Sequence, residues 1–130
     1  LAHALVQGGG EWSSSDWGLH NADERDLVAE HAAQRVQAAL AAPFGLRAFM
    51  AVTTKWRPYY DQLPPDPLSG PSADPAVALA RVGFDRSRRP PWCAVIDAAL
   101  SATAAVARAV AGHAADDSLW AVGCVSDTTG

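Results

Sequence analysis

Histidine and acidic side chains are the first residues to test for metal chemistry. The chain has four histidines, His3, His20, His31 and His113, and no two of them are four residues apart on one predicted helix. None lies next to a cysteine at a metal-binding spacing. His20, His31 and Asp16 could meet at a metal only through the tertiary fold. We therefore predict neither a metal nor a cofactor, and interpret His31 as an exposed helix residue.

Nucleophilic catalysis has equally little support in the sequence. Cys93 and Cys124 lie in apolar runs, where a thiol stays protonated and unreactive. No Gly-x-Ser-x-Gly elbow occurs, and no two carboxylates share a defined spacing. Burial would raise the pKa of Asp97, whereas an outward position on a helix would not. The chain is predicted to be a binding or structural protein more readily than an enzyme.

Two segments carry groups that could recognise a ligand. Lys55–Tyr60 mixes cations with aromatic rings, which suits a base or a peptide, but it also fits a strand end in solvent. Residues 85–89 hold three arginines, which suit a phosphate or an acidic partner, but they also fit a solvated turn. An alternative function follows from the aromatic residues. A small α+β enzyme or ligand-binding protein could use a pocket lined by Trp12, Trp17, Trp56 and Tyr59.

Composition narrows the class of protein. The 130 residues fit one domain, 1–130, with 10 basic and 14 acidic side chains spread evenly between the two halves. No half is basic, so nucleic-acid binding is disfavoured. Asp97 and Arg108 interrupt the longest apolar run, so no membrane helix is expected. Two distant cysteines do not make a disulfide framework, which favours a reducing, cytoplasmic location.

The first half of the chain predicts a helix, a strand and a loop. A capping box at Asn21–Glu24 begins a helix that ends near Ala41. Its apolar face repeats every four residues, and polar residues such as Glu30 and Gln34 lie elsewhere; the face consists of Val28, Ala32, Val36 and Leu40. Leu46–Thr54 reads as a strand that is apolar on both sides. The proline-rich residues 58–75 then form a loop or insertion.

The second half predicts two further strands and a helix. Ala76–Phe84 alternates as a strand, and so does Ser118–Ser126. Residues 91–112 contain an apolar stripe at helical spacing, Ile96, Leu100, Thr103, Ala107 and Val110, and Gly112 would end that helix. We predict helix as far as about Ala102. Ala104–Val110 also alternates, so a strand there stays open.

These elements together predict an α+β fold, with amphipathic helices packed on one face of a small, mostly antiparallel sheet. Because both faces of Leu46–Thr54 are apolar and the chain is small, a second polypeptide is expected to complete the structure. The order of elements also suits the α+β sandwiches of secretion chaperones and roadblock-type light chains.

The chain resembles the Tctex-type dynein light chains. The matching segments are Pro43-Phe44 with Leu46–Thr53, then Phe84-Asp85, and then the residues 118–122, Ser-Leu-Trp-Ala-Val. They cover about half of the chain.

The resemblance implies a non-catalytic dimer, with itself or a related chain, in a cytoplasmic motor complex at the cytoskeleton or axoneme. Such a protein binds an extended partner peptide along a sheet edge, without nucleic acid or membrane. The partner-binding residues implied at that edge are Val77, Leu79, Arg81, Phe84 and Trp120.

Overall fold

The computed structural model describes residues 1–8 and 27–115, and these residues form helices and connecting turns without a β-strand. The elements are α1 (Ala2–Gln7), α2 (Leu27–Ala41), the 3-10 helix η3 (Ala42–Phe44), α3 (Arg57–Asp61), α4 (Pro75–Ser87) and α5 (Trp92–Ala111). The predicted α+β class is therefore wrong for the described residues, whose fold is helical. The predicted capping box and the strand Ser118–Ser126 lie outside them.

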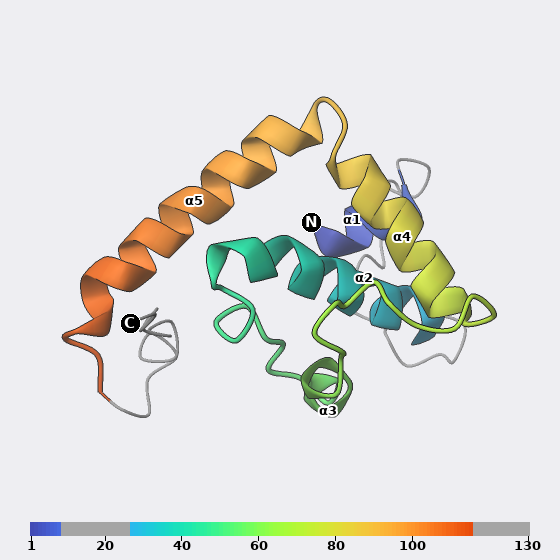
Figure 1. The fold of residues 1–130 in the computed structure, drawn as a ribbon, viewed down its shortest axis with the longest axis horizontal. Helices are drawn as coiled ribbons and strands as arrows, with labels where there is room; N and C mark the ends of the chain where they lie inside the picture. The colour runs from blue at the N-terminus through green and yellow to red at the C-terminus, as the bar shows by residue number, and fades with distance from the viewer. Residues whose placement is uncertain (9–26, 116–130) are drawn as a thin grey trace, which may run out of the picture.

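Helix α2 is the central element of the fold. It lies between α5 on one side and α3 on the other, with α1 and α4 packed along it (Figure 1). The predicted apolar face is confirmed, because Ala32, Val36 and Leu40 are all buried. Glu30 and Gln34 were predicted to lie away from the core, but they are buried too. A helix with neighbours on several sides buries polar positions that its sequence pattern places outside.

The segment predicted as the strand Ala76–Phe84 is helix α4, so that prediction was wrong. Asp74 is the N-cap, and its side chain accepts a hydrogen bond from the backbone N–H of Ala76 at 2.8 Å. Pro75 occupies the first turn, where its missing N–H costs nothing. The buried side of α4 includes Gly83, where an added Cβ would lie 3.1 Å from a methyl of Val6. Glycine there lets α1 and α4 approach closely.

The segment Leu46–Thr54 is not a strand either. The backbone N–H of Met50 donates to the carbonyl of Leu46 at 2.8 Å, which closes a helical turn. Its apolar side chains pack in two directions: Leu46 and Phe49 join the end of α5, whereas Val52 packs near α3. Only Leu46 of this segment is buried, and Phe49 and Val52 are half-buried, so its apolar contacts in two directions are made by turns.

The predicted proline-rich loop is present, although its first residues belong to α3. Arg47 holds this loop: its guanidinium donates to the carbonyls of Leu63 at 2.6 Å and Pro64 at 2.9 Å. Tyr60 completes the attachment, because its hydroxyl donates to the carbonyl of Arg47 at 2.7 Å.

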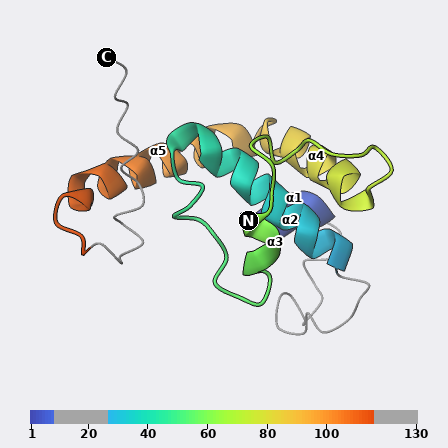
Figure 2. The same cartoon turned by 60° about the horizontal axis from the view of Figure 1, so that its bottom comes forward.

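Helix α5 is continuous from Trp92 to Ala111, and Gly112 caps it as predicted. The alternative strand at Ala104–Val110 is therefore wrong. The predicted apolar stripe faces the body of the protein, where Ile96 and Ala107 are buried and Leu100 packs against two core clusters. Seen from a second direction, α5 still lies at the edge of the molecule, reaching beyond α2 (Figure 2).

Candidate interaction surface on helix α5

The outward side of α5 is the most unusual surface that the structure describes. Apart from Ser101 and Arg108, every exposed residue of this helix is an alanine or a valine. We call these residues the outer face of α5: Ala94, Val95, Ala98, Ala99, Ala102, Ala105, Val106 and Ala109. Val95 is 67% exposed and Val106 is 52% exposed. A solvent-facing helix side normally carries charged and polar groups, so this face is suited to burial.

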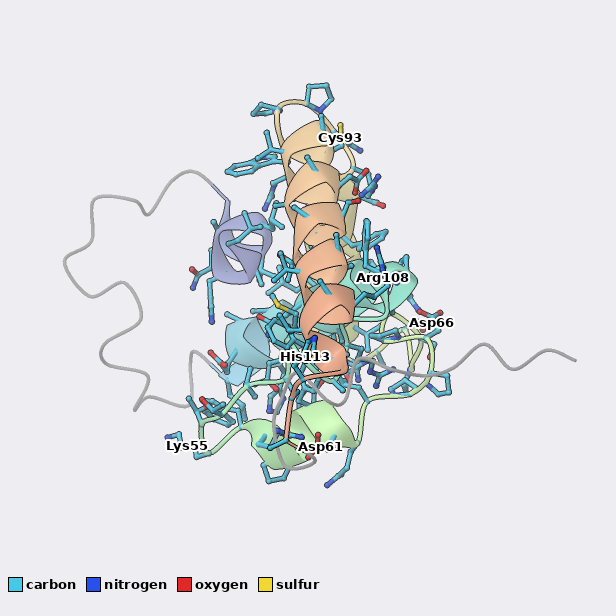
Figure 3. The ribbon with its side chains drawn as sticks, turned by 90° about the vertical axis from the view of Figure 1, so that its left-hand side faces the viewer. Lys55, Asp61, Asp66, Cys93, Arg108 and His113 are labelled. Atoms are coloured by element: carbon cyan, nitrogen blue, oxygen red, sulfur yellow. The ribbon has the colours of Figure 1, made fainter. Side chains whose placement is uncertain are left out.

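The spacing of the outer face fits contact with another helix. Val95, Ala98, Ala102, Ala105 and Ala109 recur at alternating intervals of three and four residues, which is the seam of a coiled coil. Figure 3 looks onto α5, with Cys93 near its first turn and Arg108 near its last, and no described helix lies in front of it. Small side chains along such a seam allow close approach of two helix backbones.

One border of the outer face carries the charged groups. Asp97 and Arg108 are eleven residues apart, which brings them to within about 20° of the same line along the helix. Both carboxylate oxygens of Asp97 accept hydrogen bonds from Arg88, at 2.7 and 2.8 Å. The guanidinium of Arg88 holds the pKa of Asp97 below its usual range. Of the two positions that the sequence left open for Asp97, the structure shows the outward one.

A second feature, a shallow pocket, adjoins this face between α1, α2 and α5. Its volume is about 210 Å³, and its walls are apolar apart from Gln37 and Thr103; the lining residues are Leu1, Ala2, Gln37, Leu40, Met50, Ile96, Ala99, Leu100 and Thr103. The amide of Gln37 donates to the carbonyl of Met50, and the hydroxyl of Thr103 donates to the carbonyl of Ala99 at 2.9 Å. Both polar side chains therefore have partners within the protein.

The predicted recognition segment Lys55–Tyr60 lies on the other side of α2. The rings of His31 and Tyr59 stack with their centroids 3.6 Å apart, and Trp56 meets His31 edge-on at 5.7 Å. Burial lowers the pKa of His31, so the imidazole is more easily kept neutral. The prediction of an exposed His31 is therefore wrong. Lys55 lies 4.9 Å from the centre of the Trp56 ring.

Behind this aromatic group lies a buried guanidinium, that of Arg35. It donates to the Tyr59 hydroxyl at 2.7 Å and to the carbonyls of Pro67 at 2.8 Å and Ser69 at 3.1 Å. Its donors are used in attaching the loop to α2, and this cluster reads as structural. Of the predicted aromatic pocket, Trp56 and Tyr59 are adjacent through His31, whereas Trp12 and Trp17 lie outside the described residues.

Metal-binding chemistry is not assembled in the described part of the chain. No group of three or more His, Cys, Asp and Glu side chains there could hold a metal ion. His3 lies 3.1 Å from Glu30 and thereby links α1 to α2. His20 and Asp16, the other proposed metal ligands, lie outside the described residues.

The partner-binding residues implied by the family resemblance do not form a sheet edge. Val77 is buried, and Leu79 and Phe84 pack against the core formed with α1 and α2. Arg81 donates to the carbonyl of Leu68 at 3.1 Å. These four residues lie on α4, so no strand edge is available among them, and Trp120 lies outside the described residues.

The basic residues at 85–89, which begin in the last turn of α4, are also mostly engaged within the protein. Arg86 donates to the carbonyls of Leu5 and Val6 at the end of α1, and Arg88 binds Asp97. The sequence predicted a cluster of arginines, but it did not predict that carbonyls of α1 and the carboxylate of Asp97 accept their hydrogen bonds. An anion site at this turn is therefore poorly supported.

By length and composition, α5 would also reach across a membrane. Only 17% of its most apolar window is buried in the protein, which distinguishes it from an ordinary core helix. No membrane helix was expected from the sequence because Asp97 and Arg108 interrupt the apolar run, and both charges lie within α5.

Comparison of the chain with protein-family models, curated proteins and solved structures finds no match.

Proposed function

We propose that this chain is a non-catalytic helical interaction module that binds a partner helix through the outer face of α5. The observation that carries the proposal is the apolar outer face itself, which runs the length of a 20-residue helix, about 30 Å. Association would remove these alanine and valine side chains from water, which is the dominant favourable term in most protein association. The mode is helix against helix, in place of the sheet-edge binding that the sequence suggested.

The distribution of polar groups supports binding over catalysis. Buried and half-buried polar side chains such as Arg35, Arg47 and Gln37 are engaged with backbone carbonyls of this chain. Such groups hold the fold together and leave few donors for a substrate. The pocket beside α5 has apolar walls, which suit the side chain of a partner better than a polar substrate.

A membrane is a weaker partner for α5 than another helix. Its five Val, Ile and Leu residues would contribute about −1.5 to −3 kcal/mol to insertion, whereas Asp97 and Arg108 would cost about 5 to 7 kcal/mol at the bilayer centre. Even if their positions toward the helix ends halve that cost, insertion gains little or nothing. Against a protein helix, both charges remain at the border of the face and stay in water.

Site-specific photo-crosslinking in the cells that make the protein tests this proposal. A photoreactive amino acid replaces Ala98 or Ala105 on the outer face, and Ser72, exposed in the loop before α4, in a matched control. We expect a covalent protein adduct from both α5 positions and none from Ser72. If neither α5 position yields an adduct while the protein is folded and abundant, the proposed function is wrong.

A further inference from the structure

We propose that the partner of the outer face is a second copy of this chain, bound antiparallel with the two-fold axis at Ala102. This inference rests on the proposed function and adds the identity and the direction of the partner helix. Two-fold pairing requires a surface that is complementary to itself, so that each residue faces a partner position in the other copy. The outer face meets that requirement.

The side-chain sizes match when two copies are paired about Ala102. Position 95 then lies opposite position 109, and position 98 lies opposite position 106. These two contacts each place a valine against an alanine: Val95 faces Ala109, and Ala98 faces Val106. Ala99 faces Ala105. Large against small is the arrangement that fills space along a helix seam without voids or clashes. At the axis two copies of Ala102 meet, and alanine there permits the closest approach.

The charges at the border select the antiparallel direction. In this pairing Arg108 of one copy comes opposite position 96 of the other, about 1.5 Å along the helix axis from Asp97. In antiparallel pairs the same border of both helices is shared, so the borders that carry Asp97 and Arg108 lie on the same side of the pair. Asp97 already binds Arg88, but a carboxylate has about four lone-pair sites and can accept another donor. A parallel two-fold pair would instead place the charged borders of the two copies on opposite sides of the seam, so Arg108 of one copy would not approach Asp97 of the other.

The size of the face sets the expected strength. A helix about 30 Å long and about 10 Å wide offers an outline of only about 300 Å² per copy. Stable protein interfaces bury about 1,200–2,000 Å² in total, so this one lies at the weak end unless residues around the pocket join it. We therefore expect a reversible dimer with a dissociation constant in the micromolar range.

Sedimentation of the purified full chain from about 5 to 500 µM tests the association. We expect concentration-dependent dimerisation that Ala102→Glu weakens about hundredfold or more, because two carboxylates would face each other in a dry seam. Ala78→Glu, the same change at an exposed position of α4, is the matched control and leaves the dimer intact. Arg108→Glu weakens association by no more than about fivefold at low salt, because exposed pairs contribute little.

Cysteine cross-linking tests the direction. In a Cys93→Ser, Cys124→Ser background, Ala102→Cys should oxidise to a dimer rapidly, because position 102 meets itself at the axis. Val95→Cys should not, because two copies of position 95 lie about 21 Å apart along the helices. Rapid oxidation of both variants indicates a parallel pair and overturns the antiparallel model.

Other outcomes also overturn the inference. A wild-type chain that stays monomeric at 500 µM has no self-association of the expected strength. A dimer that Ala102→Glu leaves unchanged uses another surface. If outer-face crosslinks in cells go only to a different protein, the proposed function survives and the second copy is excluded. Binding of the monomer to phosphatidylcholine vesicles, abolished by Ala102→Glu, would instead assign the face to a membrane.

Discussion

Replacing Arg35 by alanine should destabilise the protein more than any other single loss of charge among the described residues. The Arg35 residue is 8% exposed, and its guanidinium joins α2 to Tyr59 of α3 and to the loop carbonyls of Pro67 and Ser69. A fourth contact, 4.0 Å from Asp74, reaches the N-cap of α4. The side chain thus connects three elements that are distant in the sequence.

The expected cost follows from what the substitution leaves behind. Hydrogen bonds to a charged group contribute about 1.5–3 kcal/mol each, but they are not additive, and the carbonyl of Pro67 would lose a buried donor. Removal of one member of a buried ionic network typically costs about 3–5 kcal/mol. We expect Arg35→Ala to lower the free energy of unfolding by that amount, a large part of the roughly 5–15 kcal/mol of a small domain.

Urea unfolding followed by circular dichroism at 222 nm measures this difference. Arg57→Ala is the matched control, because Arg57 pairs with Asp61 at 2.7 Å on the exposed side of α3 and should cost less than about 1 kcal/mol. Arg35→Lys keeps the charge but loses the planar fork, so it should fall between the two. Equal destabilisation by Arg35→Ala and Arg57→Ala would refute the reasoning.

Three further predictions concern titration and backbone geometry. Burial raises the pKa of Tyr60 to about 12, so the stability that the neutral phenol contributes below pH 10 should be lost as the pH rises toward 12. Absorbance at 295 nm follows tyrosine ionisation, and a titration midpoint near pH 10 for Tyr60 would contradict this prediction. The hydrogen bond from His3 lowers the pKa of Glu30 below 4.5, so the free energy of unfolding should fall as the pH drops through that lowered value. Urea unfolding between pH 3 and 7 should show a smaller loss of stability at acid pH in Glu30→Gln than in the wild type. Gly70→Ala should cost about 1–3 kcal/mol in urea unfolding, because φ is +150° and the new Cβ would lie 2.9 Å from a valine methyl of α4, whereas Gly112→Ala, with open space around it, should not destabilise.

The helices that sequence analysis identified are those whose apolar residues recur at three and four positions. The stripe from Ile96 to Val110 correctly gave the inward side of α5, and Gly112 correctly gave its end. The stripe from Ala32 to Leu40 likewise gave one buried side of α2. The spacing of apolar residues and a terminal glycine are local signals, so they predict a helix without knowledge of the tertiary contacts.

Ala76–Phe84 was wrongly predicted as a strand because alanine is ambiguous. In Ala76–Phe84 the alternation holds only when alanine counts as apolar on both sides. The same alanines also permit a helical pattern, because Val77, Ala80 and Phe84 recur at spacings of three and four. The sequence did contain the deciding signal, Asp74 followed by Pro75, which is an N-cap before a first-turn proline. The conformation of the loop before α4 could not be predicted from the sequence, because it depends on hydrogen bonds from Arg35 and Arg47, which are distant in the sequence.

The candidate surface was missed for a related reason. The sequence placed the need for a second polypeptide in Leu46–Thr54, where both sides looked apolar, but turns there satisfy both sides within one chain. Helix α5 is the element that is apolar on two sides: Ile96 and Ala107 face inward, and Val95 and Val106 face outward. A helix that is apolar all round is stable in water only when something covers it, in a core, a membrane or an assembly. Its inner side accounts for the core, and the two charges disfavour the membrane. An assembly is the environment in which the outer side of α5 is best accommodated.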